Sequence, residues 1–352
     1  MKNRFPNAER RPTIEDVATL AGVSKGTVSK VINGGNYYVS EAMRDRIAAA
    51  VAELEFQPNA IARDLGRRRT DTVGVVVANI ANPLYPEMIK GVSDVLDESS
   101  LTVILGTSDG SAAKEAELVQ AMRQRQVDGV IIASVRMGRD EVAELVASGL
   151  EVVLASRNLP HDGLVTSVIV DNYDGGVKAV RHLVSHGHRR IAHIAGPQDV
   201  VPFVERRRAY LDECARSGLD VEATLVAQAP ESSPEDGAAA MEQLLDLPTP
   251  PTAVFVGSDT MAMGALEVCD QRRLTIPRDL AVVSFDNVWV SRMPGVQLTT
   301  VDSRAHELGR LAAQELVARI EKRRAGEGRQ EPRQMVLEAN LVVRKSCGCV
   351  PA

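Results

Sequence analysis

Residues 13–32 constrain this 352-residue chain more than any other segment, because they carry the start and stop signals of two short helices joined by one glycine. Thr13 and Asp16 have the spacing of a capping box, and apolar residues follow at helical intervals. Gly22 suits a tight turn, and Ser24 suits the cap of a second helix. The pattern predicts a helix-turn-helix unit whose second helix enters the DNA major groove.

The second predicted helix carries hydroxyl and ammonium groups on the face opposite its apolar residues. Such groups hold phosphates and reach base edges. A pair of amphipathic helices used only for packing is the alternative, but it leaves the coincidence of cap, turn and basic face unexplained. The residues expected on this face are Lys25, Thr27, Ser29 and Lys30.

A third helix is expected from a Ser40 cap to about Phe56, with Ile47, Val51 and Leu54 on its apolar side. It closes a small three-helix core. The whole chain carries a net charge of −6, yet residues 1–70 hold 12 Lys or Arg against 8 Asp or Glu, so the remainder carries −10. A basic module on an acidic body indicates nucleic acid as the partner of the first part only.

From Thr72 onward, short apolar runs alternate with helix-length amphipathic segments. Runs this apolar predict two parallel sheets, each with helices on both faces. Two doubly wound lobes that face a cleft make a natural site for a small molecule. The expected strands are VGVVVA (73–78), LTVILG (101–106), VIIAS (130–134), EVVLAS (151–156), RIAHIA (190–195), AVFVGS (253–258) and LAVVSF (280–285).

The chain is expected to pass from the first lobe to the second near Asp171. It is expected to return near Leu298–Val301, before a long helix around Arg304–Lys322. The first lobe would then hold residues 71–170 and 299–326. The second would hold residues 171–298 and 327–345, with residues 346–352 as a short tail.

Longer motifs extend over nearly the whole chain. The first part contains DVATLAGVSKGTVSKVIN and VSEAMRDRIAAAVAELEFQPNAIARDL, and the second contains NPLYPEMIKGV, QVDGVII, PTAVFVGSDTMAMGALEV and IPRDLAVVSFDN. Together they resemble the lactose-repressor (LacI/GalR) family of bacterial transcription regulators. The resemblance implies an α/β fold: an all-α DNA-binding headpiece (1–57), a hinge (58–70) and a two-lobed body (71–345) like the periplasmic sugar-binding proteins.

In that family the first, second and sixth residues of the recognition helix select the operator, and these positions are Lys25, Gly26 and Lys30 here. Gly26 has no side chain where the family usually has one. The matching hinge folds on the operator and inserts a leucine into the minor groove, which implies that role for Leu65. DNA contacts are expected at Thr13, Ser24, Lys25, Gly26, Thr27, Ser29, Lys30, Asn33, Tyr38, Asn59, Ala62 and Leu65.

The hinge sequence NAIARDLGRRRT is too short to form a stable helix alone. Its order is therefore expected to depend on DNA. A flexible linker with three solvated arginines, Arg67 to Arg69, is the alternative interpretation.

The resemblance also implies an effector site in the cleft. Leu84 and Tyr85 occupy positions at which the family places apolar or aromatic side chains against an effector ring. Ser134, after the third strand, is a candidate polar contact. Arg206 and Asp286 correspond to the family's effector-holding arginine and hydrogen-bond acceptor. A solvated charge, next to two further arginines, is the alternative for Arg206.

Two departures from the family concern the same pocket. Ser156 precedes Arg157 where an acidic residue is common, and Ser258 precedes Asp259 where Asn is common. These smaller hydroxyls predict a roomier pocket or a different effector. A sugar or related metabolite is the expected ligand class.

A histidine cluster and a cysteine pair suggest metal or redox chemistry, but each lacks the further ligands that such a site needs. His182 and His186 have the spacing of two ligands on one helix face, yet no Glu lies between them to complete a zinc-hydrolase motif, and the family's GHRRIA turn accounts for part of the run. Cys347 and Cys349 lie in a short tail without further ligands. We therefore expect no metal, no cofactor and no catalytic residue.

The sequence has no P-loop, nucleophile elbow or Gly-rich dinucleotide fingerprint, which disfavours an enzyme. It shows no apolar run long enough for a membrane span and no signal core, so a cytoplasmic, nucleoid-associated protein is expected. A transcription regulator, most simply a repressor, that binds a near-palindromic operator as a homodimer is the leading hypothesis. A solute receptor without DNA activity and an enzyme are the alternatives.

Overall fold

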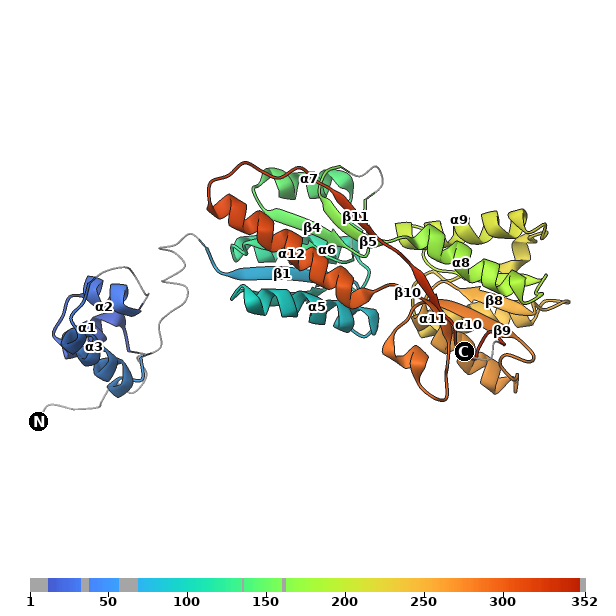
Figure 1. Ribbon diagram of the computed structural model, residues 1–352, viewed down its shortest axis with the longest axis horizontal. Coiled ribbons are helices and arrows are strands. Elements are labelled where there is room, and N and C mark those ends of the chain that lie inside the picture. Colours follow the sequence, from blue (N-terminus) through green and yellow to red (C-terminus); the bar gives the residue numbers. More distant parts are fainter. Residues whose placement is uncertain (1–11, 33–37, 57–68, 135, 160–162, 349–352) are drawn as a thin grey trace, which may run out of the picture. The chain divides into compact units, whose positions relative to one another are not determined.

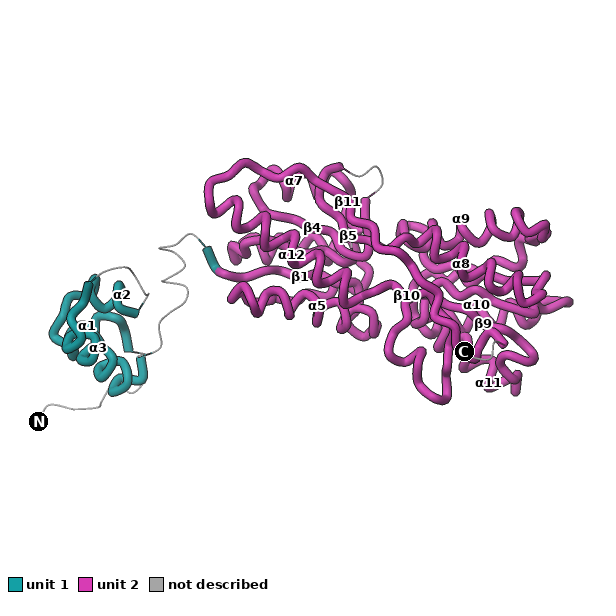
Figure 2. Tube along the Cα trace, in the orientation of Figure 1, with its two compact units in different colours: residues 1–70 teal, residues 71–352 magenta. Residues whose placement is uncertain are grey.

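The computed structural model describes residues 12–32, 38–56, 69–134, 136–159 and 163–348. The chain divides into two compact units, Met1–Thr70 and Asp71–Ala352 (Figure 2). The division falls where the sequence predicts the body to begin.

The first unit contains α1 (Ile14–Ala21), α2 (Lys25–Ile32) and α3 (Glu41–Glu53). The predicted capping box is present: Asp16 N–H donates to Thr13 Oγ1 at 3.4 Å, and Thr13 N–H donates to Asp16 Oδ2 at 2.7 Å. Gly22 ends α1 with a φ of 63°, a left-handed conformation that favours glycine. The helices enclose a small apolar core formed by Val17, Ala18, Ala21, Val28, Ile47, Ala50 and Phe56.

Two details of the third predicted helix are wrong. Ser40 stands at the cap of α3, but its side chain makes no capping hydrogen bond; its carbonyl instead accepts from the N–H groups of Met43 and Arg44. The helix ends at Glu53 and does not reach Phe56, because the chain turns at Glu55, whose φ is 46°. That turn folds Phe56 back into the core.

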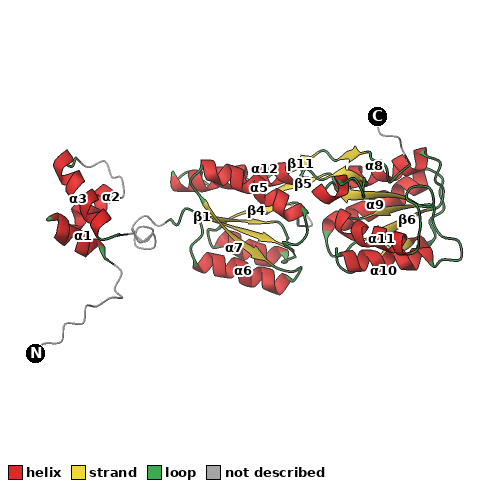
Figure 3. Cartoon of the chain, turned by 90° about the horizontal axis from the view of Figure 1, so that it is seen from below, coloured by secondary structure: helices red, strands yellow, loops and turns green. Residues whose placement is uncertain are grey.

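The first lobe of the body is a six-stranded sheet, within the described residues, in the order β11-β5-β4-β3-β1-β2. All neighbouring strands are parallel. Helices cover both faces (Figure 3). The strands are β1 (Thr72–Val77), β2 (Thr102–Thr107), β3 (Gly129–Ile132), β4 (Glu151–Ala155), β5 (Thr166–Val170) and β11 (Gln334–Leu337), and the helices are α5 (Leu84–Glu98), α6 (Ala112–Gln124), α7 (Arg139–Ala147) and α12 (Ala305–Arg324).

The second lobe is a six-stranded sheet, again among the described residues, in the order β12-β10-β9-β8-β6-β7 (Figure 1). Its strands are parallel except β12, which runs antiparallel to β10. The strands are β6 (Ile191–Ala195), β7 (Val226–Gln228), β8 (Ala253–Val256), β9 (Ala281–Asp286), β10 (Thr299–Asp302) and β12 (Asn340–Val342), and the helices are α8 (Asn172–Ser185), α9 (Val201–Arg216), α10 (Pro234–Leu245) and α11 (Asp259–Gln271), with 3-10 turns η1 (Ala223–Leu225) and η2 (Trp289–Arg292).

The apolar runs form strands because both faces of each sheet are covered. Every residue of β3, β4, β6, β8 and β9 is buried. Such strands carry no polar alternation, since neither face meets water. The two sheets and the helical headpiece confirm the predicted fold class.

The predicted division of the last 55 residues between the lobes is wrong in two places. Residues 299–302 form β10, which pairs with β9 in the second sheet, so the chain returns to the first lobe only after Asp302. Residues 334–337 form β11, which pairs with β5 in the first sheet, although the sequence placed them in the second lobe. Both strands have four residues and each extends an edge that the preceding chain left open, so local sequence does not specify which sheet receives them.

The chain crosses between the described parts of the lobes after β5, between β10 and α12, and between β11 and β12 (Figure 1). All of these strands lie at the same side of their sheets: β5 and β11 at one edge of the first sheet, and β10 and β12 at one edge of the second. The opposite edges are formed by β2 and β7. The lobes are thus covalently joined along one side.

The predicted tail is partly a piece of the second lobe. Ser346 and Cys347 are buried. Ser346 Oγ accepts from Thr299 N–H at 2.8 Å and donates to the carbonyl of Val282 at 2.6 Å. Residues 346–347 therefore belong to the body, while Cys349 lies outside the described residues. Among the described helices, none combines the length and apolar character needed to cross a bilayer.

Candidate functional site: a DNA-reading face and an interlobe pocket

The headpiece presents its basic residues at the surface of α2. Thr27 N–H donates to Ser24 Oγ at 3.1 Å, so Ser24 caps the helix as predicted. Lys25, Gly26 and Lys30 are exposed. The three positions to which the resemblance assigns operator selection therefore lie on one accessible helix.

The other predicted DNA contacts differ in accessibility. Lys25 Nζ lies 3.7 Å from Glu15, an exposed ion pair that is weak enough to exchange for a phosphate. Tyr38 is 92% exposed, whereas Thr13, Thr27 and Ser29 are half-buried. Four of the predicted contacts lie outside the described residues, namely Asn33, Asn59, Ala62 and Leu65.

Arg206 lies on α9 and is buried within the second lobe. Its guanidinium donates to Asn172 Oδ1 at 3.0 Å through Nε and to the carbonyl of Gly257 at 2.6 Å through Nη1. It also lies over the ring of Phe285, 3.5 Å from the ring centroid. Arg206 is therefore a fixed internal group, and its interpretation as a solvated charge is wrong.

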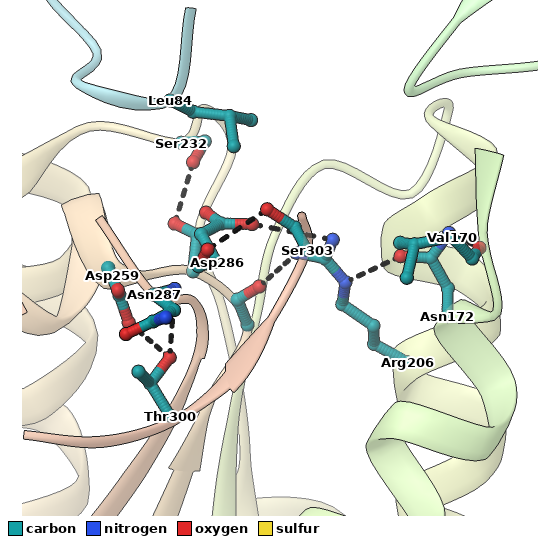
Figure 4. A network of polar contacts seen from close by, with 12 residues as sticks. Leu84, Val170, Asn172, Arg206, Ser232, Asp259, Asp286, Asn287, Thr300 and Ser303 are labelled. Carbon is teal, nitrogen blue, oxygen red and sulfur yellow. Dashed lines mark hydrogen bonds and ion pairs between the residues drawn. The ribbon is translucent and has the colours of Figure 1, made fainter. Parts of the chain in front are cut away.

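The remaining guanidinium nitrogen of Arg206, Nη2, lies 3.6 Å from Oδ1 of Asp286 (Figure 4). Both side chains are buried. Burial raises the pKa of Asp286 to about 7, although Arg206 opposes the shift. Burial also lowers the pKa of Arg206 to about 10. The pair at 3.6 Å is longer than a good hydrogen bond, which leaves both groups capacity for a ligand.

The backbone of Asp286 is strained. Its φ is 122°, a region that non-glycine residues rarely adopt, and Asn287 follows with a φ of 57°. The strain is held by Ser303, whose hydroxyl donates to the Asp286 carbonyl at 2.9 Å. Ser303 lies at the crossing between β10 and α12. The orientation of the Asp286 carboxyl is thus tied to a segment that joins the lobes.

A second buried carboxylate, Asp259, accepts hydrogen bonds from the loop after Asp286 and from β10. Its Oδ2 accepts from Val288 N–H at 2.9 Å. Its Oδ1 accepts from the Thr300 hydroxyl at 2.7 Å (Figure 4). Burial raises the pKa of Asp259 to about 6. The neighbouring Ser258 caps α11 by accepting from Met261 N–H at 3.3 Å.

The first lobe supplies a less polar wall. Leu84 and Tyr85 begin α5 and are buried. Arg157, after β4, donates to the carbonyl of Ser134 at 2.5 Å and approaches Tyr85 Oη at 3.5 Å. The Ser134 hydroxyl donates to Glu115, so in this structure it is directed into the lobe. Its role as an effector contact remains a prediction.

A cavity of about 340 Å³ opens between the two lobes. Leu84, Glu87 and His306 line it from the first lobe. Asp286, Trp289 and Asp302 line it from the second. The cavity thus brings together the predicted residues Leu84 and Asp286. Its lining combines apolar side chains, the aromatic ring of Trp289, carboxylates and arginines, a mixture suited to a ligand with many hydroxyl groups.

Three supporting residues of this site are absent from the sequence-based prediction. Asn172 accepts a hydrogen bond from Arg206 and lies two positions after the end of β5, so its position at the carboxyl end of a strand was the available signal. Ser303 carries no such signal. Glu115 is fully buried on α6, where it shares a face with Val119 and Met122; a lone carboxylate in line with apolar residues was the clue.

The histidine cluster does not assemble a metal site among the described residues. The rings of His182 and His186 are 4.4 Å apart between centroids. His186 Nδ1 lies 2.8 Å from the His182 carbonyl. Across the described ranges, no three His, Cys, Asp or Glu side chains are grouped as metal ligands. His193 is buried instead between the rings of Tyr210 and Phe255.

Comparison with known proteins accounts for both units. Residues 13–59 match the model of bacterial regulatory proteins of the lacI family, and residues 180–347 match that of a periplasmic binding protein-like domain. The HTH-type transcriptional regulator CelR of Thermobifida fusca is 39% identical over 344 residues, which cover 96% of this chain and 98% of CelR. The chain belongs to the lacI family of bacterial regulatory proteins.

Other transcriptional regulators are also similar over most of their length. Catabolite control protein A of Priestia megaterium is 35% identical over 301 residues, which cover 85% of this lacI-family chain and 90% of that protein. The HTH-type transcriptional repressor CytR of Escherichia coli K12 is 31% identical over 343 residues, which cover 97% of this chain and 98% of CytR. These relatives are transcriptional regulators and not enzymes, so the lacI-family chain is a transcriptional regulator.

Solved structures of the family share the fold. A complex of the transcriptional regulator CelR with cellobiose superposes with a TM-score of 0.70 at 37% identity, and covers 96% of this chain and 100% of that chain. The lac repressor dimer bound to operator and the anti-inducer ONPF has a TM-score of 0.82 at 26% identity, with 96% and 99% covered.

Proposed function

We propose that this lacI-family regulator is a repressor that binds a near-palindromic operator as a homodimer and changes its DNA affinity when a saccharide binds between the lobes. One observation carries the proposal: a single chain joins an exposed basic recognition helix to a cavity that contains a buried, strained carboxylate. The first feature suits DNA, and the second suits a small ligand. We further propose that it acts in the cytoplasm, on the nucleoid.

The saccharide is inferred from the chemistry of the pocket. Asp286 supplies a hydrogen-bond acceptor for hydroxyl groups at the cavity wall, and Trp289 supplies an aromatic ring. The guanidinium of Arg206 lies 3.6 Å from the Asp286 carboxylate. The relative CelR was solved with cellobiose, which supports a short saccharide of this kind as the first ligand to test.

Coupling is proposed to run through residues 58–70, which join the units. An effector that changes the relation of the lobes would alter the spacing of the paired hinges in a dimer. Minor-groove insertion by two Leu65 side chains needs those hinges in register. An effector with different affinities for the two arrangements would therefore change operator affinity.

Operator binding can be tested by selecting double-stranded fragments from random DNA with the full-length protein. We expect a palindromic consensus, and binding that weakens steeply as salt rises because phosphate contacts release counterions. Lys30→Ala should weaken binding of the selected site by roughly tenfold, a cost typical of a lost base contact. A chain that selects no sequence would contradict the regulator function.

The hinge is tested by Leu65→Ala. We expect operator affinity to fall at least tenfold while cellobiose affinity stays within twofold, because Leu65 is proposed to contact DNA alone. Gel shift and isothermal titration calorimetry measure the two affinities. Arg67→Ala is the matched control, and it should mainly reduce the salt dependence. Equal losses of both affinities in Leu65→Ala would contradict the minor-groove role.

The alternatives predict different results in the same assays. A solute receptor would bind the saccharide but select no DNA sequence. An enzyme would consume the saccharide during a long incubation. Sedimentation at micromolar concentration distinguishes the proposed dimer from a monomer or tetramer.

A further inference from the structure

The cleft has an open side, opposite the chain crossings. β2 and β7 form the sheet edges on that side. Asp199 lies in the loop after β6, and Glu231 lies in the loop after β7. Contacts between these loops and the first lobe act far from the crossings, where relative motion of two hinged lobes is largest.

Arg136, in the loop after β3, makes such a contact. Its Nη1 donates to Asp199 Oδ2 at 2.9 Å, and its Nη2 donates to Glu231 Oε2 at 3.1 Å. The Arg136 side chain is only 14% exposed, whereas those of Asp199 and Glu231 are 61% and 57% exposed. The guanidinium thus lies on the inner side of its two carboxylates, and it bridges the lobes.

The first lobe holds Arg136 ready for this contact. The buried carboxylate of Glu115 accepts from the backbone N–H groups of Arg136 at 2.9 Å and Met137 at 3.1 Å. It also accepts from the Ser134 hydroxyl. A buried carboxylate with three donors fixes a loop firmly, because breaking any one of them leaves a charge poorly solvated.

Separation of the lobes would part Arg136 from both acceptors, since both belong to the second lobe. The three residues therefore favour the closed arrangement over an open one. A ligand that binds only the closed arrangement gains apparent affinity in proportion to the closed fraction.

We infer that Arg136 is a positioning residue for effector binding, which latches the open side of the cleft through Asp199 and Glu231. This inference rests on the proposed function for its ligand, but the latch itself is a property of the free body. It acts through lobe closure and needs no contact with the effector.

Because the latch consists of exposed carboxylates and one arginine, salt weakens it. An uncharged saccharide has no charge of its own to screen. Its affinity for the wild-type protein should nonetheless fall about three- to tenfold between low and high salt, a range consistent with two partly exposed pairs. This salt dependence is the signature that separates a latch from a merely structural arginine.

The test uses isothermal titration of full-length protein with cellobiose at low and high sodium chloride. Arg136→Gln and the double variant Asp199→Asn with Glu231→Gln should each bind cellobiose about three- to tenfold more weakly at low salt and lose the salt dependence. Combining all three substitutions should add little, since each variant removes the same interaction. Arg272→Gln is the control, because Arg272 pairs with Asp246 at 2.6 Å within the second lobe.

A second measurement does not depend on the effector. Spin labels at Glu144→Cys on α7 and Glu235→Cys on α10, with Cys349→Ser, report the distance between the lobes by double electron–electron resonance. Arg136→Gln should lengthen and broaden the distance distribution of the ligand-free protein, as should high salt in wild type. An unchanged distribution overturns the latch. If neither cellobiose nor another saccharide binds wild type, the proposed effector class fails, and the distances still decide the latch.

Discussion

At the scale of single residues, the pocket is organised around carboxylates that the protein buries. Asp286 and Asp259 are both removed from water, and burial raises their pKa values to about 7 and about 6. A buried carboxyl with a raised pKa binds its proton more tightly in the folded body than in the unfolded chain. The folded state therefore loses stability as the pH rises from about 4 to about 7, and the loss is complete above that window.

Asp286→Asn removes one of these two carboxyl groups, so the variant does not lose the stability that protonation of Asp286 contributes at low pH. The shift from the ordinary value of 3.8 to about 7 corresponds to roughly 4 kcal/mol at most, at about 1.4 kcal/mol per pKa unit. Between about pH 4.5 and 7.5, the melting temperature of the body should shift by several degrees in favour of the variant, relative to wild type. Circular dichroism melting across that range measures it. Parallel pH profiles for the two proteins would show that Asp286 is already ionised at low pH.

Sequence reasoning found the Arg206–Asp286 pair more easily than the contacts of Ser134. Arg206 and Asp286 stand in long motifs, and the structure brings them within 3.6 Å. Ser134 was expected at the pocket, but its hydroxyl is engaged by Glu115. The apolar face around Glu115 indicated its burial, but its hydrogen bond to Ser134 could not be foreseen, because the two residues lie 19 positions apart on different elements.

At the scale of elements, the close approach of α5 and α12 depends on glycine. A Cβ atom on Gly309 would lie 2.0 Å from the carbonyl oxygen of Met88, and one on Gly91 would lie 2.0 Å from that of His306. Both obstacles are backbone atoms, which cannot rotate away. The two helices can pack at this distance only because each carries a glycine at the contact.

Gly309→Ala should therefore destabilise the body by about 3 kcal/mol, because the helices must separate or deform. For a unit of this size the melting temperature should fall by roughly 5–10 °C. Gly328→Ala is the control, since a Cβ there meets nothing within 4 Å. Similar melting temperatures for the two variants would show that α12 shifts at little cost.

The sequence predicts long buried strands better than short edge strands. The seven expected strands correspond to β1, β2, β3, β4, β6, β8 and β9, with ends that differ by one or two residues. The short strands β5, β7, β11 and β12 escaped notice because three to five residues carry little periodicity. β10 was assigned to the wrong lobe, since its pairing partners β9 and β12 are specified by the tertiary fold.

At the scale of the whole molecule, the two units should respond separately to heat and to ligand. The headpiece has its own apolar core, whereas the two lobes of the body share several chain crossings in the described residues. Differential scanning calorimetry should show one transition for the headpiece and one for the body. Cellobiose should raise only the body transition, by an amount that grows with its concentration. A single transition that shifts as a whole would indicate that the units unfold together.

Strand β11 completes the first sheet and β12 completes the second, which affects when each lobe can finish folding during synthesis. Both strands lie near the end of the chain, so neither sheet is complete until residues 334–342 have left the ribosome. The headpiece, by contrast, is made first and can fold at once. A chain that stops before Gln334 would carry a finished DNA reader on two unfinished lobes. Premature termination would then leave a headpiece without the completed lobes that the proposed dimer and effector site require.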